Sequence, residues 1–112
     1  MITRGYRLLA KWVIHTVGPV WRGGSAGEDA LLASCYRNSL ALAAQHNLHT
    51  IAFPAISTGA YDFPLERATR IAVTEVKNFL EQDTSIEEVI FVCFGSATCR
   101  VYYATLPNVE LD

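Results

Sequence analysis

The sequence predicts an α/β domain with a small, mostly parallel β-sheet. Three short apolar runs, at residues 11–17, 50–53 and 88–94, are rich in β-branched and aromatic side chains, and each precedes a segment with helical spacing of apolar residues. This alternation is typical of α/β proteins, in which crossovers are right-handed and central strands are parallel. The chain has 112 residues, of which 51% are hydrophobic and 18% charged, so we expect one domain around one core.

The first strand is expected at residues 11–17 (KWVIHTV). Its nearly continuous apolar character suits a strand that is covered on both faces. Residues 1–6 are a candidate for a short, weak strand before it. The pair Gly18-Pro19 ends the first strand, and a loop follows.

The first helix is expected from about Glu28 to His46. Ser25 and Glu28 match a capping box, in which the hydroxyl accepts from a free amide and the carboxylate reaches back. Asn47 fits a left-handed stop after the last turn. The positions expected to face the core are Leu32, Cys35, Ser39 and Ala43.

The second half repeats the alternation. Residues 50–53 form the expected second strand, and Pro64 stands where the first turn of a helix tolerates proline. Residues 88–94 (EVIFVCF) are the most continuously apolar run, and Ser96 caps a final helix that Pro107 ends. The buried stripe of the middle helix is expected at Leu65, Ala68, Ala72, Val76 and Phe79.

Composition and charge exclude several classes of protein. The net charge is −2 and the basic residues are scattered, whereas a nucleic-acid interface needs a clustered basic face. The chain holds no apolar run of membrane length. The three cysteines lack metal-ligand spacing, so we expect reduced thiols, no metal or cofactor, and a cytoplasmic protein.

The stretch PAISTGAYDFP, at residues 54–64, joins the second strand to the middle helix. Ligands of parallel sheets collect beyond the carboxyl ends of the strands, and a helix N-terminus attracts anions. If Gly59 takes a positive φ, successive amides of this loop can form a nest around a phosphate without any lysine. From the residues alone, the favoured interpretation is an ordinary turn in which Tyr61 and Phe63 cover the core, because turns that contain glycine are common.

Three segments together resemble the macro domain family, in particular its bacterial branch related to O-acetyl-ADP-ribose deacetylases. They are VIHTVGP at residues 13–19, FPAISTGAYDFP at 53–64 and VIFVCF at 89–94. The resemblance implies a three-layer α/β/α fold and a module that binds ADP-ribose or a related nucleotide. It also implies the roles of the site residues: amides of Ser57, Thr58, Gly59 and Ala60 on the diphosphate, Tyr61 on the distal ribose, Phe94 against the adenine, and Pro54 and Ile56 along the cleft.

The resemblance covers about the C-terminal two-thirds of the family fold. The family's adenine-reading aspartate, its glycine-rich loop and its catalytic asparagine and aspartate precede the matching region, and their motifs do not occur here. We therefore expect weakened binding and no catalytic residues. The alternatives are a folded remnant or interaction protein without tight ligand binding, and an ADP-ribose ester hydrolase.

The resemblance also implies a gap in the sheet. In the family, a further strand lies between those matching residues 12–17 and 50–53. Unpaired buried backbone groups cost roughly 1–3 kcal/mol each, so the gap needs a partner. Either the two halves close up and pair directly, or a second chain supplies the pairing, and a homo-oligomer is expected on the second ground.

Other reactive residues have structural interpretations. We expect His15 to be a core histidine and Cys93 a buried, inert thiol, because neither has an evident orienting partner. Asp62 is interpreted as a helix cap, with a general base as the alternative. Arg22 and Arg67 are expected on the surface.

Overall fold

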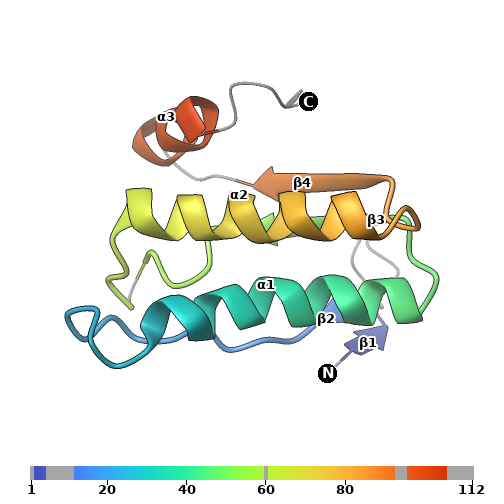
Figure 1. Ribbon diagram of the computed structural model, residues 1–112, viewed down its shortest axis with the longest axis horizontal. Coiled ribbons are helices and arrows are strands. Elements are labelled where there is room, and N and C mark those ends of the chain that lie inside the picture. Colours follow the sequence, from blue (N-terminus) through green and yellow to red (C-terminus); the bar gives the residue numbers. More distant parts are fainter. Residues whose placement is uncertain (1, 5–11, 60, 93–95, 106–112) are drawn as a thin grey trace.

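The computed structural model describes residues 2–4, 12–59, 61–92 and 96–105. Helices and strands alternate through most of the described chain (Figure 1). The strands are β1 (Ile2–Arg4), β2 (Trp12–Ile14), β3 (Thr50–Pro54) and β4 (Glu88–Val92), and the helices are α1 (Glu28–Gln45), α2 (Leu65–Gln82) and α3 (Ser96–Thr105). Within the described part, no helix has the length and apolarity needed to cross a bilayer.

The strands form two separate two-stranded sheets. β3 and β4 are parallel and pair in register from Thr50 with Glu88 to Pro54 with Val92. β1 and β2 are antiparallel, with Thr3 opposite Val13. The α/β class with a small parallel sheet is therefore confirmed, and part of the candidate strand at residues 1–6 is present as β1.

The expected closing of the sheet is wrong, because β2 does not pair with β3. Both strands instead lie along α1. Cys35 of this helix donates its thiol to the Val17 carbonyl just beyond β2, at 3.4 Å, while the Tyr36 ring packs edge-on against Phe53 of β3, at 5.0 Å. Both segments thus contact the same helix, and a pocket remains between β2 and β3.

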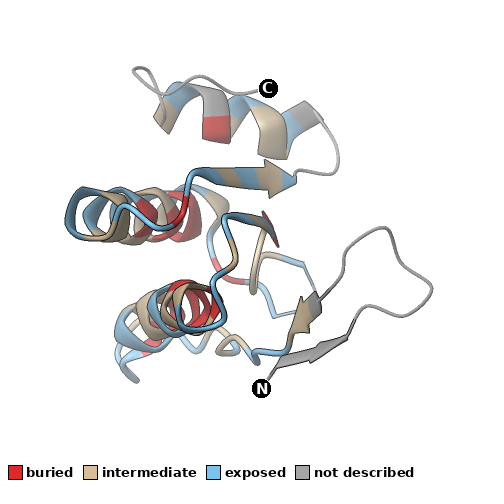
Figure 2. Ribbon diagram, turned by 90° about the vertical axis from the view of Figure 1, so that its right-hand side faces the viewer, coloured by how far each residue is buried: buried red, intermediate tan, exposed pale blue. Residues whose placement is uncertain are grey.

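The core lies between the inner faces of α1 and α2 and the β3–β4 pair (Figure 2). The stripe predicted for α1 is buried along its whole length, and Ala68, Ala72 and Val76 of α2 are buried as expected. Two aromatic side chains from outside the helices, Phe53 of β3 and Phe63 of the following loop, complete this core. Leu65 and Phe79, the two ends of the stripe predicted for α2, are only half-buried, so the amphipathic spacing predicted most of the helix packing.

The end of α1 follows the prediction. Asn47 has φ 56°, and its N–H donates to Ala44 O at 3.1 Å. The N–H of Leu48 donates to Ala43 O at 3.0 Å. This pair of bonds is a Schellman motif, which satisfies the last carbonyls of the helix.

The start of α1 differs from the prediction, because Ser25 and Glu28 do not form a capping box. The N-cap is Gly27, which is left-handed, and Glu28 is the first helical residue. Its buried carboxylate accepts from the N–H groups of Arg22, Gly24 and Ala26 at 2.9, 2.8 and 2.6 Å. The positive φ of three glycines, at positions 23, 24 and 27, folds the loop back over this carboxylate, and a chain without them would not turn so tightly.

Candidate functional site

The candidate loop, residues 55–64, begins at the carboxyl end of β3 and leads into α2. Because β3 and β4 are parallel, their carboxyl ends lie at the same edge of the sheet. This is the edge at which open α/β sheets bind ligands. The predicted position of the site within the fold therefore agrees with the structure, whereas its individual contacts to a ligand stay predictions.

The loop is held in shape by bonds that leave several of its amides available. Asp62 N–H donates to Gly59 O at 3.0 Å, and Phe63 N–H donates to Ser57 O at 2.9 Å. The Thr58 hydroxyl donates to Ala55 O at 3.0 Å. Among the described residues, the N–H groups at positions 57–59 donate no backbone hydrogen bond outside helices and strands. The sequence interpretation assigns these amides to an anion, and this assignment stays a prediction.

Gly59 was expected to take the left-handed conformation in this loop, but other residues take it. Gly59 does not take a positive φ, whereas Ser57 has φ 65° and Asp62 has φ 58°. Both side chains are short and polar, and such residues tolerate the left-handed region better than most. A Cβ built on Gly59 would meet no atom within 4 Å, so open space lies beside this residue. The glycine therefore provides room, and the turn itself is made by its neighbours.

Ser57 lies where two segments meet. Its hydroxyl oxygen is buried and has no hydrogen-bond partner in the described structure. A Cβ built on Gly18 would lie 2.6 Å from Ile56 Cγ2 and closer still to Ser57 Oγ. The backbone after β2 thus packs directly on the candidate loop, and only glycine permits this approach. The sequence predicted Gly18 only as a strand end and missed this contact.

A second cluster anchors the far side of the loop. Trp21 N–H donates to Tyr61 O at 2.8 Å, and the Trp21 ring packs against Phe63 at a centroid distance of 4.9 Å. Arg67 lies over the same indole at 5.1 Å and binds both carboxylate oxygens of Asp29 at 2.6 to 3.0 Å. Trp21 therefore anchors the loop, which was one of its two predicted roles.

Tyr36 of α1 links the candidate loop to the core through its hydroxyl group. Its hydroxyl is hydrogen-bonded to the Ile56 backbone and to Tyr102, which in turn bonds Thr69. Burial is the main cause that raises the pKa of both phenols above the ordinary value. The sequence analysis did not single out Tyr36, which is absent from the stripe predicted for the first helix, so this link was missed.

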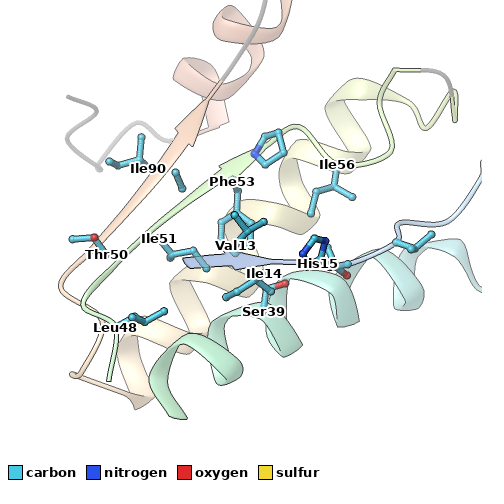
Figure 3. Close-up of a pocket in the computed structure, with 14 residues that line it drawn as sticks. Val13, Ile14, His15, Ser39, Leu48, Thr50, Ile51, Phe53, Ile56 and Ile90 are labelled. Atoms are coloured by element: carbon cyan, nitrogen blue, oxygen red, sulfur yellow. The ribbon is translucent and has the colours of Figure 1, made fainter. Parts of the chain in front are cut away.

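The other predicted site residues are distributed as follows. Pro54, at the end of β3, is exposed and Ile56 is half-buried, and both line a pocket of about 810 Å³ (Figure 3). Tyr61 is 40% exposed, so its ring is accessible to a ligand. Ala60 and Phe94 lie outside the described residues. The pocket runs from the loop back between β2 and β3, past His15, Ser39 and Leu48.

Several secondary interpretations need correction. His15 is exposed and borders the pocket, because β2 ends one residue before it. Asp62 is not the cap of α2, since that helix begins at Leu65 and its N-cap position is Pro64. Cys35 is a free, buried thiol, but Cys99 is disulfide-bonded, so the expectation of reduced thiols is wrong for Cys99. Cys93 lies outside the described residues.

The described residues were also compared with the ligand sets of metal sites. Within the ranges that the structure describes, no group of three or more histidine, cysteine, aspartate or glutamate side chains is placed to hold a metal ion. The site consists of backbone amides, small side chains and one accessible aromatic ring, a combination suited to a phosphorylated sugar.

The fold and the loop define an α/β module with a candidate site at the carboxyl edge of its parallel strands, and comparison with known proteins identifies its family. The Macro domain family model matches residues 1–72, so the chain belongs to the Macro domain family. A macro domain-containing protein of Methanosarcina mazei is 61% identical over 108 residues, which cover 96% of this chain and 58% of that protein. An O-acetyl-ADP-ribose deacetylase of Klebsiella pneumoniae is 52% identical, with 96% of this chain and 62% of the deacetylase covered.

Solved structures confirm the fold. The Oceanobacillus iheyensis macrodomain with ADP has a TM-score of 0.91 at 37% identity, covering 96% of this chain and 56% of its own. The Trypanosoma brucei macrodomain in complex with ADP-ribose has a TM-score of 0.86 at 39% identity, covering 94% of this chain and 44% of its own. The chain thus spans about 60% of the length of the curated relatives it matches, 61% and 58% for the first two.

Proposed function

We propose that this chain binds ADP-ribose or a closely related nucleotide through the loop at residues 54–64. Membership of the Macro domain family supports this, as do the ADP and ADP-ribose held by two solved relatives. The amides at positions 57–60 hold the diphosphate, the Tyr61 ring lies against the distal ribose, and Pro54 and Ile56 line the cleft. Phe94 packs on the adenine.

Two features of the loop carry the proposal. Among the described residues, the N–H groups at positions 57–59 donate no backbone hydrogen bond outside helices and strands, and nothing lies within 4 Å of a Cβ built on Gly59. A turn that served only to connect β3 to α2 would be expected to satisfy such amides or cover them. Helix α2 adds the positive end of its dipole on the same side, because it begins at Leu65.

Titration calorimetry with ADP-ribose tests the proposal. Replacing Gly59 with isoleucine fills the open space, so binding is expected to fall by at least about tenfold, or roughly 1.4 kcal/mol. The thermal unfolding midpoint should stay unchanged, because no protein atom meets the new side chain. Gly59→Ala is the matched control and should retain most of the affinity. Equal binding by the wild type and Gly59→Ile would refute the proposed loop contact.

We further propose that the chain alone binds weakly and does not hydrolyse ADP-ribose esters. The described part of the site offers amides, a ring and the exposed Asp62, with no oriented acid–base pair among the residues named above. The specific alternative is a hydrolase, favoured by the deacetylase of Klebsiella pneumoniae. Turnover of O-acetyl-ADP-ribose by the wild type would establish that alternative. Absence of binding at millimolar ADP-ribose would favour an interaction protein instead.

Self-association belongs to the same proposal as an expected property. In the described part of the chain, β2 and β3 do not pair with each other, and an unpaired strand edge favours pairing with a second polypeptide. Light scattering of the wild-type chain across a concentration series measures the oligomeric state directly.

A further inference from the structure

A chain of buried hydroxyl groups connects the two ends of the candidate loop. It consists of the side chains of Tyr36 on α1, Tyr102 on α3 and Thr69 on α2, all three of which are buried. One end of the chain meets the backbone of Ile56, near the start of the loop. The other end meets the carbonyl of Leu65, the first residue of α2. The hydroxyl chain thus reaches the loop close to both of the elements that it joins.

The direction of each hydrogen bond in this chain follows from the number of protons available. The Thr69 hydroxyl has one proton, and it donates this proton to the Leu65 carbonyl at 2.7 Å. Toward Tyr102 the same oxygen can only accept, so the Tyr102 hydroxyl donates to Thr69. The Tyr102 oxygen accepts from Tyr36, whose own oxygen accepts from the Ile56 N–H. Because one end is a fixed donor and the other a fixed acceptor, a single arrangement of protons satisfies every member.

Aromatic contacts hold the two phenols in place. The Tyr36 ring packs edge-on against Phe53 of β3 at a centroid distance of 5.0 Å, and the Tyr102 ring packs against Phe91 of β4 at 5.1 Å. The two phenylalanine rings stack on each other at 6.4 Å. The four rings come from two helices and from both strands of the parallel pair, so neither hydroxyl can move without displacing the core.

The amides proposed to bind the diphosphate follow directly after the residue that this chain holds. Ile56 precedes Ser57, and the Phe63 N–H donates to Ser57 O at 2.9 Å, which closes the loop on itself. If the Ile56 N–H lost the Tyr36 oxygen, its peptide group would have to turn toward another acceptor, because an unpaired N–H inside the protein is costly. Rotation of that peptide group would shift the residues after it.

We propose that Tyr36, Tyr102 and Thr69 are positioning residues, which hold the ends of the candidate loop so that the amides at positions 57–59 keep one orientation. None of the three belongs to the loop or lines the pocket beside it. They therefore act on a ligand only through the loop. The effect on nucleotide binding rests on the proposed function, whereas the effect on the conformation of the loop does not.

Two substitutions of Thr69 separate its hydroxyl from the shape of its side chain. Thr69→Val keeps the shape but leaves the Tyr102 proton without its acceptor, so ADP-ribose binding should weaken about fivefold in titration calorimetry. Thr69→Ser keeps the hydroxyl and loses a methyl group, and it should bind as the wild type does. Tyr36→Phe removes the acceptor of the Ile56 N–H itself and should weaken binding at least about tenfold.

Val76→Ala is the control for a general loss of stability. Val76 lies in the same core, in the second half of α2, and carries no hydroxyl. The variant should have a lower thermal unfolding midpoint, because it leaves a cavity, and an unchanged affinity at temperatures where every variant is folded. Amide chemical shifts give a second measurement without ligand. Those of residues 57–59 should change in Tyr36→Phe and Thr69→Val, and should stay close to the wild type in Thr69→Ser and Val76→Ala.

Two results would overturn the proposal. One is that Tyr36→Phe and Thr69→Val leave the chemical shifts of residues 57–59 unchanged, since the hydroxyl chain would then not hold the loop. The other is that Val76→Ala weakens binding as much as Thr69→Val does at an equal loss of stability, since the hydroxyls would then serve stability alone. If the wild type bound no ADP-ribose, the proposed function would fail, and the chemical shifts of the ligand-free variants would still decide whether the chain positions the loop.

Discussion

Glu28 shows how one carboxylate can organise a loop. Its three accepted N–H bonds lower its pKa from 4.5 to about 2, with the bond from Arg22 the largest cause. The sequence marked Glu28 as part of a cap, and the side chain does reach back, but to the loop rather than to Ser25. The spacing of serine and glutamate was a sound signal for the start of the helix and a poor one for the actual bonds. The three left-handed glycines changed the partners.

Acid unfolding measures this contribution. Because the pKa of Glu28 is lower in the folded chain than in the unfolded chain, its stabilisation is complete above pH 4.5 and is lost as the pH falls toward 2. Glu28→Gln is expected to lower the free energy of unfolding at neutral pH and to flatten its slope between those limits. Urea unfolding at a series of pH values checks this, with Glu66→Gln on the exposed surface as the control. An unchanged slope in Glu28→Gln would contradict the assignment.

Gly18 is a second residue whose role depends on distant partners. Gly18→Ala places a methyl group against Ile56 Cγ2 and Ser57 Oγ, so we expect a loss of roughly 1–3 kcal/mol in the free energy of unfolding. Adding Ser57→Ala removes the nearer atom and should recover part of the loss. Urea unfolding of the single and double variants measures both effects. If Gly18→Ala were neutral, the two segments would not be in tight contact in solution.

At the scale of single elements, the sequence predicted the helices better than the strands. The stripe of α1 and the middle of the α2 stripe are buried because helical spacing alone decides which side chains share a face. The first strand was predicted over residues 11–17, whereas β2 ends at Ile14, opposite Ile2 of β1. The end of a strand depends on its pairing, and local spacing carries no information about it. The exposure of His15 follows from the same early end.

The left-handed end of α1 at Asn47 was predicted correctly, and its contribution to the stability of the fold can be tested by substitution. Asn47→Ala puts a Cβ-bearing residue without a local polar group at φ 56°, so the free energy of unfolding should fall by about 1 kcal/mol. Asn47→Gly should be neutral or slightly stabilising, because glycine adopts this conformation without strain. Chemical denaturation of the three proteins distinguishes these outcomes. Equal losses in both variants would mean that the asparagine side chain, and not its conformation, matters.

At the scale of the whole molecule, the fold class and the position of the candidate site could be predicted, but the way the sheet is completed could not. The order of elements and the apolar runs led to the parallel pair β3–β4 and to the loop at its carboxyl edge. The contacts that hold this loop join residues far apart in sequence, such as Gly18 with Ser57 and Trp21 with Tyr61. Only the folded arrangement brings them together, so single-residue patterns could not predict them.

The open side of β3 has a consequence for solvent exchange of main-chain protons. Ile51 and Phe53 direct their peptide groups to β4, whereas Thr50 and Ala52 direct theirs to the opposite edge, toward the pocket between β2 and β3. Deuterium uptake followed by NMR should therefore alternate along the strand, with slow amides at positions 51 and 53 and fast ones at 50 and 52. Uniform protection across all four positions would mean that some polypeptide already covers this side in solution.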